Sequence, residues 1–309
     1  MKILVTGGLG FVGSHIVNRY LSDGHEVIIL DSNEETANKN RIKWNENVKL
    51  IEERIESFKI SEYLNYVTSE VDLVINSAAE THVDYSFDRP MDFINANIIG
   101  LHNLVQFCIK TDTPIVHLST DEVIGTGEDL YEDSMLKPTN PYAFTKCAGE
   151  NLLHAYGYCS NLDWKVVRLN NIYGKMQFPD KLIPKFIYRI LDGKKLPLHG
   201  DGKQTRNFLN VDDFVDALQL VVNDGENRNI YNVSTFEEYP IVDVTNMLCE
   251  TMSVDPSEII EHVEDRPFND PCYHSKNDKL LQLGWKPKYT LKGYLSELVD
   301  WYKNNREMF

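Results

Sequence analysis

The sequence is poor in positive charge for its length. Its 309 residues include 31 lysines and arginines against 47 aspartates and glutamates, which gives a formal net charge of -16 at pH 7. No run of lysines or arginines forms a local basic patch. Such a chain repels the phosphates of nucleic acid and the anionic surface of a membrane. We therefore expect neither nucleic acid nor a membrane among its partners.

The sequence also lacks the patterns of disulfide-linked, membrane-spanning and metal-binding proteins. Its five cysteines are odd in number and have no CxxC spacing, which is typical of reduced thiols in a cytoplasmic protein. No apolar stretch reaches the roughly 20 residues needed to cross a bilayer. Residues 1–5 lead directly into a predicted strand, so we expect no signal peptide. The nine histidines are scattered, and we expect no metal site.

Glycine, by contrast, is concentrated near the N-terminus. Residues 2–6 form a short apolar run typical of a buried strand, and the segment Gly7-Gly8-Leu9-Gly10-Phe11-Val12-Gly13 follows it. A helical pattern then covers residues 12–21, and residues 25–31 predict a second strand. The three glycines of the GxGxxG spacing permit a tight turn, a close approach of backbone to pyrophosphate, and close packing of the helix. The free N–H groups of the helix would meet the phosphates, so this unit predicts dinucleotide binding.

The residue at the end of the second predicted strand is Asp31. A carboxylate at this place can accept hydrogen bonds from the adenosine ribose of a dinucleotide. Ser32, Asn33 and Glu34 follow it without a nearby cation in the sequence, so a 2′-phosphate would meet anions. The pattern therefore favours NAD over NADP. The alternative is that Asp31 is a turn residue that closes the strand.

Strands and helices continue to alternate along the first half of the chain. The predicted strands cover residues 48–51, 71–76, 114–119 and 163–170, and the predicted helices cover 57–67, 90–110 and 141–156. This alternation predicts an α/β fold, a Rossmann-like doubly wound parallel sheet whose ligands bind beyond the carboxyl ends of the strands. Pro90 and Pro141 stand where they can open their helices.

Two neighbouring carboxylates follow one of the apolar strands. Thr120-Asp121-Glu122 comes directly after residues 114–119, at the end of a predicted buried strand. In a chain with a dinucleotide loop, two carboxylates at such an edge suggest an acid and a base. The alternative is a pair of solvated loop residues.

The predicted helix after Pro141 carries a tyrosine and a lysine four residues apart. Tyr142 and Lys146 therefore share one helix face. A cation beside a phenol lowers the pKa of the phenol, because it favours the phenolate. A phenol tuned in this way can serve as a base toward a sugar hydroxyl. Either Thr139 or Asn140 can cap the helix.

These motifs together resemble those of the extended short-chain dehydrogenase/reductases, and within them the nucleotide-sugar 4,6-dehydratases. The resemblance runs nearly from end to end. It rests on the segments Thr6–Ser14, Ala78–Asp84, Ser119–Val123, Tyr142–Lys146 and Asn170–Gly174. The Thr-Asp-Glu triplet is the specific part, because related epimerases and decarboxylases share the tyrosine and lysine but are not expected to carry the carboxylate pair.

The resemblance implies a catalytic role for each of five residues. Tyr142 would take the proton of the sugar 4-hydroxyl, Lys146 would hold the nicotinamide ribose, and Thr120 would bond near the 4-oxygen. Glu122 would remove the proton at carbon 5, and Asp121 would protonate the departing 6-hydroxyl. The product would be a nucleotide-linked 4-keto-6-deoxy sugar.

The resemblance also implies two sets of binding residues. The cofactor set, besides Tyr142 and Lys146, contains Gly7, Gly10, Phe11, Val12, Gly13, Asp31, Ser32, Asn33, Ile55, Ser77, Ala78, Ala79 and Ile172. The substrate set contains Thr81, Thr120, Asn171, Lys181, Leu182, Arg206, Asn232, Arg266 and Tyr273. Ile124, which stands where the family commonly has Tyr, and Arg54 before Ile55 are departures from the family pattern.

From residue 171 the sequence changes character, with more proline and broken periodicity. We predict an NAD-binding domain over residues 1–170, to which about 207–235 return, and a smaller α/β nucleotide-sugar-binding lobe over 171–206 and 236–309. UDP-glucose is the favoured substrate and dTDP-glucose the alternative. A 4-epimerase on the same scaffold and a non-catalytic NAD-binding sensor are the rival functions. The family also implies a homodimer formed through two long helices, at about 90–110 and 142–157.

Overall fold

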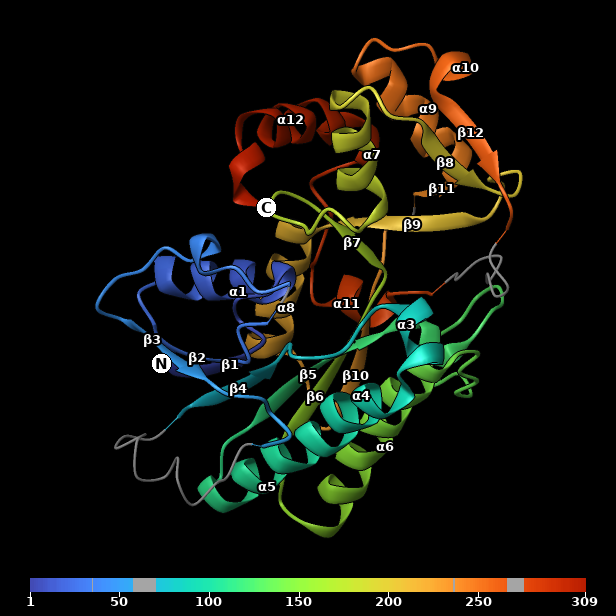
Figure 1. The fold of residues 1–309 in the computed structure, drawn as a ribbon. Helices are drawn as coiled ribbons and strands as arrows, with labels where there is room; N and C mark the ends of the chain where they lie inside the picture. Colours follow the sequence, from blue (N-terminus) through green and yellow to red (C-terminus); the bar gives the residue numbers. More distant parts are fainter. Residues whose placement is uncertain (35, 58–70, 236, 266–274) are drawn as a thin grey trace.

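The structure is a computed structural model that describes residues 1–34, 36–57, 71–235, 237–265 and 275–309. Its centre is a sheet of seven parallel strands in the order β10-β6-β5-β4-β1-β2-β3 (Figure 1). The runs of Ile, Leu and Val in these segments are buried on both faces, as a covered parallel sheet requires. The strands are β1 (Lys2–Thr6), β2 (Glu26–Asp31), β3 (Val48–Glu52), β4 (Leu73–Asn76), β5 (Ile115–Thr120), β6 (Trp164–Leu169) and β10 (Asn229–Val233).

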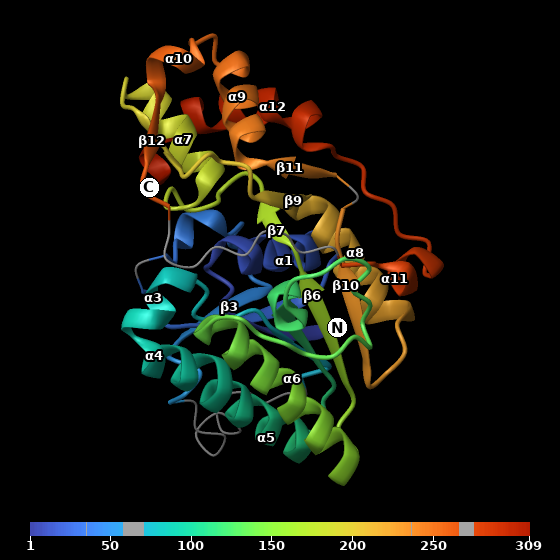
Figure 2. The same cartoon turned by 90° about the vertical axis from the view of Figure 1, so that its right-hand side faces the viewer.

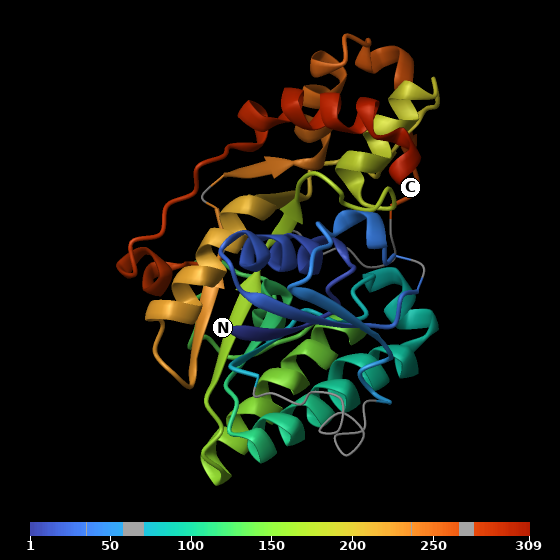
Figure 3. The ribbon, with the colours of Figure 1, turned by 90° about the vertical axis from the view of Figure 1, so that its left-hand side faces the viewer.

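Helices cover both faces of this sheet, so the predicted doubly wound fold is confirmed. On one face, Ile3 and Val5 pack with residues of α1 (Phe11–Ser22) and α8 (Val211–Asp224), which lie side by side in Figure 3. Leu4, between them in the strand, packs on the other face with residues of α5 (Leu101–Thr111) and α6 (Pro141–Cys159). Successive side chains of a strand point to opposite faces, so one strand serves both layers.

The second face is covered by two long helical segments. Predicted helix 90–110 is one helical path built from α4 (Pro90–Ile94), a π segment η2 (Asn95–Gly100) and α5 (Leu101–Thr111). Pro90 opens it, as predicted. Helix α6 (Pro141–Cys159) packs beside it (Figure 1). The predicted helix 57–67 lies largely outside the described residues.

A smaller α/β lobe stands over the carboxyl ends of the large sheet (Figure 2). Its strands form a three-stranded sheet, β11-β9-β7, and a pair, β12-β8. They are β7 (Asn171–Tyr173), β8 (Leu196–His199), β9 (Thr205–Asn210), β11 (Glu238–Pro240) and β12 (Ile260–Val263). Its core lies among α7 (Leu182–Leu191), α9 (Ile241–Thr251) and α12 (Leu291–Asn304).

The chain passes between the large sheet and the small lobe several times. Strand β9 pairs with β7 and β11, so the return to the large sheet begins with α8 and is completed by β10. The predicted boundaries of the two domains stay a prediction. The remaining short helices are η1 (Lys39–Arg41), α3 (Val83–Asp88), η3 (Asp121–Ile124), α10 (Pro256–Ile259), α11 (Asp278–Gln282) and η4 (Arg306–Met308). No helix in the described part of the chain has the length and apolarity to cross a membrane.

A buried ion pair joins α6 to the sheet. The Glu150 carboxylate accepts hydrogen bonds from Arg168 of β6, with Nη2 to Oε2 at 2.8 Å and Nε to Oε1 at 3.0 Å, and from the Ser119 hydroxyl of β5 at 2.5 Å. The side chains of Arg168 and Glu150 are 1% and 3% exposed. Arg168 Nη1 also donates to the carbonyl of Glu132 at 3.0 Å. Removing one partner would leave the other charge buried without compensation.

Arg168→Ala should therefore lower the free energy of unfolding by about 3–5 kcal/mol, because the Glu150 carboxylate would remain buried and unpaired. The double substitution Glu150→Leu with Arg168→Met should recover most of this loss. Urea denaturation measures both. Asp300→Asn, which breaks an exposed pair with Lys303, is the control and should change stability little. A double variant as unstable as Arg168→Ala would contradict the assignment.

Candidate active site

The glycine loop packs tightly against the segment that follows β4. Gly7 has a positive φ of 64°, and a Cβ there would lie 2.7 Å from Cα of Ala78. A Cβ at Gly13 would lie 2.1 Å from the carbonyl oxygen of Gly7. Both positions therefore require glycine. Helix α1 begins directly after Gly10, and no side chain caps its N-terminus. Phe11 and Val12 are its first two residues, so the loop and the free N–H groups fit the phosphates of a dinucleotide.

Asp31 holds the same loop from the neighbouring strand. Its Oδ2 accepts a hydrogen bond from the backbone N–H of Leu9 at 2.9 Å, and its Oδ1 accepts one from Asn33 N at 2.8 Å. The side chain is buried, which raises its pKa. Ser32 and Asn33 are exposed beside it. Asp31 therefore closes the turn at the end of β2. It also lies at the carboxyl edge of the sheet, where we expect the adenosine ribose.

The structure brings cations near this edge that the order of residues did not reveal, and Arg54 is one of them. Arg54 follows β3, which pairs with β2, and it forms ion pairs with Glu34 and with Glu56, the latter at 2.5 Å from Nε to Oε1. The two carboxylates compensate its charge. Ile55 is buried against the π segment, where a Cβ at Gly100 would meet its Cγ1 at 2.4 Å.

The predicted residues after β4 are half-buried at the same sheet edge. They are Ser77, Ala78 and Ala79. The N–H of Ala78 donates to the Thr6 hydroxyl at 3.1 Å, and that hydroxyl donates to Asn76 Oδ1 at 2.6 Å. Their small side chains leave the backbone accessible to a cofactor. Ile172, in β7, is also half-buried.

The triplet Thr120-Asp121-Glu122 lies where β5 ends and η3 begins. Thr120 caps this short helix, and its Oγ1 accepts from Glu122 N at 3.3 Å and donates to Asp121 Oδ1 at 3.2 Å. Asp121 is 6% exposed, and Glu122 is half-buried. Burial raises the pKa of Asp121 to about 6, although hydrogen bonds from Asn170 and Thr120 oppose the rise. A carboxyl with this pKa can hold and release a proton near neutral pH.

Tyr142 and Lys146 lie at the start of α6, and both are buried. The predicted direction of the tyrosine pKa is opposite to what the structure shows. Burial and the neighbouring Glu122 carboxylate raise the pKa of Tyr142. Lys146 Nζ donates to the carbonyl of Leu118 at 2.5 Å, and burial lowers its pKa to about 8. The helix spacing alone could not show that burial outweighs the effect of the lysine.

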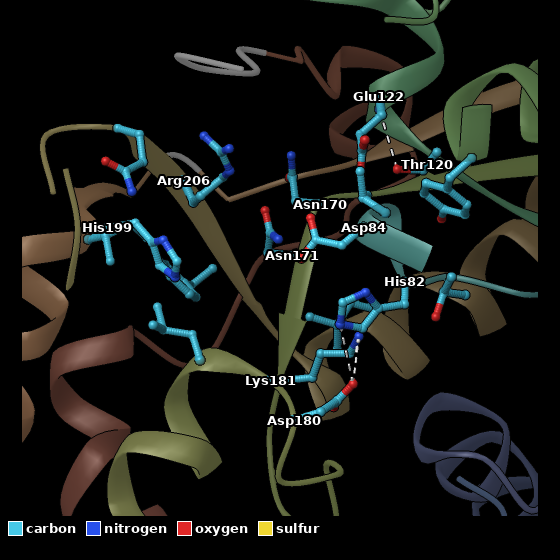
Figure 4. Close-up of a pocket in the computed structure, with 18 of the residues that line it drawn as sticks. His82, Asp84, Thr120, Glu122, Asn170, Asn171, Asp180, Lys181, His199 and Arg206 are labelled. Carbon is cyan, nitrogen blue, oxygen red and sulfur yellow. Dashed lines mark hydrogen bonds and ion pairs between the residues drawn. The ribbon is translucent and has the colours of Figure 1, made fainter. Parts of the chain in front are cut away.

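A cavity of about 400 Å³ lies between the triplet and the small lobe (Figure 4). It brings together four of the five predicted catalytic residues, namely Thr120, Asp121, Glu122 and Tyr142. It also brings together five predicted substrate residues beyond Thr120 and one predicted cofactor residue: Thr81, Asn171, Lys181, Leu182, Arg206 and Ile172. Lys181 stands at the N-cap position of α7 and Arg206 lies on β9, so the lobe supplies both cations.

The other three predicted substrate residues are Asn232, Arg266 and Tyr273. Arg266 and Tyr273 lie outside the described residues. Asn232 is fully buried in β10, where its Nδ2 donates to the carbonyl of Lys276 at 2.8 Å and its N–H donates to Glu132 at 3.2 Å. It does not line the cavity. Its position in the sheet turns the side chain toward the 275–277 segment, and its substrate contact stays a prediction.

Several cavity residues were not predicted from the sequence. Asn140 Nδ2 donates to Glu122 Oε2 at 2.7 Å, and Asn170 Nδ2 donates to Asp121 Oδ2 at 2.6 Å. His82 stacks on Tyr85 with ring centroids 4.2 Å apart. Its Nε2 lies 3.9 Å from Asp180 Oδ2, and a dashed line joins the two side chains in Figure 4. The further lining residues are Val83, Asp84, Gln177, Pro197, Leu198, His199, Gln204, Phe208 and Ile241.

The only sequence signal for the two asparagines was their position beside recognised motifs. Asn140 precedes Pro141, and Asn170 precedes the predicted Asn171. Neither position indicates which carboxylate an amide will reach. Within the described ranges, no group of three His, Cys, Asp or Glu side chains could hold a metal ion.

The fold and the site together define a class of enzyme. A parallel α/β sheet with a glycine loop at its centre, and a tyrosine and a lysine at its carboxyl edge, is the arrangement of the extended short-chain dehydrogenase/reductases. The chain belongs to the NAD dependent epimerase/dehydratase family, whose model matches residues 3–234. The predicted cofactor, NAD, is confirmed by this membership and fits the glycine loop.

Similar proteins include enzymes of two nucleotide types. The chain is 39% identical over 318 residues to a trifunctional UDP-glucose 4,6-dehydratase/UDP-4-keto-6-deoxy-D-glucose 3,5-epimerase/UDP-4-keto-L-rhamnose-reductase of Arabidopsis thaliana, covering 99% of this chain and 48% of that protein. It is 35% identical to the dTDP-D-glucose 4,6-dehydratase of Homo sapiens, covering 98% and 90%. The chain thus spans about half the length of the plant relatives it matches.

A similar solved structure is that of DesIV, a dTDP-glucose 4,6-dehydratase from Streptomyces venezuelae with NAD and TYD bound. It is 32% identical, covers 100% of this chain and 99% of its own, and has a TM-score of 0.94. The likeness therefore extends over both the large sheet and the small lobe.

The raised pKa of Asp121 predicts a pH-dependent stability. The folded chain holds this proton more tightly than the unfolded chain, so stability should fall as the pH rises from the ordinary value of 3.8 to about 6. The shift of about two units corresponds to roughly 3 kcal/mol. The unfolding free energy of the wild type, relative to that of Asp121→Asn, should fall by this amount between about pH 4 and 6.5 and stay constant above. A difference that does not vary with pH would contradict the assignment.

Proposed function

We propose that this protein is an NAD-dependent nucleoside-diphosphate-glucose 4,6-dehydratase, which converts its substrate to the 4-keto-6-deoxy sugar and water. The observation that supports this most strongly is the presence of Asp121, Glu122 and Tyr142 in one cavity. A 4-epimerase needs only the oxidation and reduction, whereas a dehydratase also needs an acid and a base at carbons 6 and 5. The carboxylate pair supplies both.

The first step is the oxidation at carbon 4. Tyr142 takes the hydroxyl proton, and Thr120, at the end of β5, bonds to the same oxygen. The phenol has a raised pKa in the ligand-free protein, because it is buried beside Glu122. Binding of the positively charged nicotinamide ring near it would favour the phenolate. NAD, when bound, supplies the acceptor for the hydride of carbon 4 and the donor of the hydride that later enters carbon 6.

The second step is the elimination of water. Once carbon 4 is a ketone, the proton on carbon 5 is acidic, and Glu122 removes it. Asp121 gives its proton to the 6-hydroxyl, which leaves as water. A pKa of about 6 allows Asp121 to carry that proton in a part of the molecules near neutral pH. Burial of the aspartate and partial exposure of the glutamate support different roles for the two groups.

The diphosphate of the substrate would lie against the small lobe. Lys181 and Arg206 line the cavity there, and an arginine can bind phosphate through two N–H groups at once. Lys181 Nζ is 3.3 Å from Asp180 Oδ2, so a phosphate would compete with that carboxylate. Thr81, Asn171 and Leu182 remain the proposed neighbours of the sugar and nucleotide. In the proposed cofactor site, the glycine loop holds the pyrophosphate, Asp31 the adenosine ribose and Lys146 the nicotinamide ribose.

We prefer UDP-glucose to dTDP-glucose as the substrate. The segments 182–187 and 196–202 in the sequence support this preference, as does the higher identity to the plant UDP-glucose enzymes than to the human dTDP-glucose enzyme.

Mass spectrometry of the products from both nucleotides, offered together, is the test. We expect UDP-glucose to lose water before dTDP-glucose does. A plain hexose epimer would support the 4-epimerase instead, and tight NAD binding without turnover of either nucleotide would support a sensor.

Substitutions at the proposed base and at the tyrosine should stop the reaction at different stages. Glu122→Gln should leave oxidation intact, so reduced dinucleotide accumulates while exchange of the carbon 5 proton with D₂O falls by at least about 10²-fold. Tyr142→Phe should prevent the reduction of bound NAD⁺ altogether. Absorbance of the dinucleotide and NMR of the sugar measure the two effects. Normal exchange in Glu122→Gln would rule out Glu122 as the base.

We also propose a cytoplasmic homodimer. The cysteines in the described segments, which leave out Cys272, are free thiols. The two long helical segments carry exposed apolar side chains: Met91 at 59%, Ile99 at 44%, Phe144 at 55% and Tyr158 at 90%. Phe144 and Tyr158 are fourteen residues apart, which places them on one side of α6. This side is a suitable surface for a second copy of the chain.

The double substitution Phe144→Lys with Tyr158→Lys should convert the dimer to monomers, because it places charges in the apolar contact. Sedimentation velocity compares it with the wild type. Met135→Lys changes an equally exposed apolar side chain, 74% exposed, in the 125–137 loop and should leave the dimer intact. A wild-type protein that sediments as a monomer would refute the proposed assembly.

A further inference from the structure

Each carboxylate of the catalytic pair receives a hydrogen bond from a different asparagine. Asn140, immediately before α6, donates from Nδ2 to Glu122 Oε2 at 2.7 Å. Asn170, immediately after β6, donates from Nδ2 to Asp121 Oδ2 at 2.6 Å. Figure 4 shows Asn170 beside the triplet, at the top of the cavity. The carbonyl oxygen of Asn140 has a hydrogen-bond donor, whereas the carbonyl oxygen of Asn170 has none among the described residues. This difference decides which protonation state of each carboxyl the amide can bind.

The amide of Asn140 is locked in its orientation. Its Oδ1 accepts the N–H of Ala143 at 2.8 Å and caps the N-terminus of α6. Rotation of the amide by 180° would point its NH₂ group at that N–H and remove the cap. Glu122 therefore always faces a donor. A donor favours the ionised carboxylate, which is the form that a general base needs.

The amide of Asn170 is not locked in this way. It is 7% exposed, and its Oδ1 is buried without a hydrogen-bond partner among the residues that the structure describes. Among the described residues, the other hydrogen bond of its Nδ2 goes to Ser275 Oγ at 3.5 Å, the outer limit of a hydrogen bond. Rotation by 180° would turn the unsatisfied carbonyl toward Asp121, where it could accept the O–H of the protonated acid. The amide can thus bond to either form of Asp121.

We propose that Asn140 and Asn170 are positioning residues that assign the base to Glu122 and the acid to Asp121, one by a fixed amide and the other by an amide that rotates with the proton. The expected effect of the two asparagines on the reaction rate rests on the proposed dehydration, whereas the rotation of the Asn170 amide does not. The burial that raises the pKa of Asp121 to about 6 makes both of its forms accessible.

The other charged groups around the pair do not reproduce this distinction. Arg206, on β9, lowers the pKa of Asp121 and so favours its ionised form. On α6, the Tyr142 phenol responds to both carboxylates, and each of them raises its pKa. These effects act on the pair from the cavity side. The Thr120 hydroxyl also donates to Asp121 Oδ1, at 3.2 Å, but it accepts the backbone N–H of Glu122 at 3.3 Å as well. The two asparagines each donate to one carboxylate of the pair and differ in their freedom to rotate.

The rotation can be tested without any substrate. Side-chain ¹⁵N–¹H resonances are assigned from the peaks lost in Asn140→Ala and Asn170→Leu, and are followed in the full chain between about pH 5 and 8. The Asn170 resonance should move with a midpoint near pH 6, and this movement should vanish in Asp121→Asn. The Asn140 resonance should show no such midpoint. An Asn170 resonance that stays constant while the Asp121 carboxyl titrates would overturn the proposal.

Kinetics of the holoenzyme then test the consequence for the reaction. Asn140→Asp keeps the cap but replaces the donor by a carboxylate oxygen, so the acid limb of the kcat profile should move up by at least one pH unit while melting stays near that of the wild type. Asn170→Leu should lower kcat by about 10- to 100-fold with little change in KM, and reduced dinucleotide should accumulate.

Asn18→Ala is the control for simple loss of hydrogen bonds. Asn18 uses both ends of its amide on α1, toward the carbonyl of Arg41 at 2.7 Å and the N–H of Lys43 at 2.9 Å. It should lower stability without moving the pH profile. If Asn140→Asp and Asn170→Leu change kcat no more than this control, and their profiles coincide with that of the wild type, the asparagines are merely structural. Absence of water loss in the wild type would instead overturn the proposed function, and the titration of the amides would still decide the rotation.

Discussion

Parallel hydrogen bonding between β1 and its two neighbours is the constraint on which the rest of the structure depends. It places the ends of β2, β1, β4, β5 and β6 at one edge of the sheet, although these ends are separated by long stretches of sequence. The glycine loop leaves β1 at that edge, the carboxylate triplet leaves β5, and Asn170 leaves β6. Because parallel strands require crossover helices, the same pairing also places α6, with its tyrosine and lysine, against the carboxyl end of β5.

Burial of polar groups under this edge gives the site its chemical character. Asp121 and Lys146 lie in surroundings that disfavour their charged forms, so their pKa values move toward neutrality from opposite sides, to about 6 and about 8. Deeper in the molecule, Glu150 and Arg168 keep their charges because they compensate each other and because Ser119 and a backbone carbonyl complete their hydrogen bonds. The ion pair and Ser119 join α6, β5 and β6. Helix α6 carries Tyr142 and Lys146, the carboxylate triplet begins at the end of β5, and Asn170 follows β6.

Sequence patterns were most informative where one residue type is required by local geometry. The glycine spacing, the strand ends and Pro90 and Pro141 at helix starts could be predicted because each depends on neighbours in the chain. The pKa of Tyr142 could not, because it depends on burial beside Glu122, twenty residues earlier. The residues that follow Asp31 in the sequence include no cation, whereas the pairing of β2 with β3 brings Arg54 to Glu34. Asn232 was placed at the substrate by resemblance, whereas β10 turns it toward Lys276.

By itself the sequence determined the family, the parallel α/β architecture, the dinucleotide loop and the presence of the Thr-Asp-Glu, Tyr and Lys groups. These depend on periodicity and on short motifs, which are properties of neighbouring residues. Only the tertiary structure decided which amide meets which carboxylate, how far each acid and amine is buried, and which lobe residues face the cavity. Those outcomes depend on desolvation and on contacts between residues far apart in the chain, such as Asn140 with Glu122 and Asn170 with Asp121, and no local pattern encodes them.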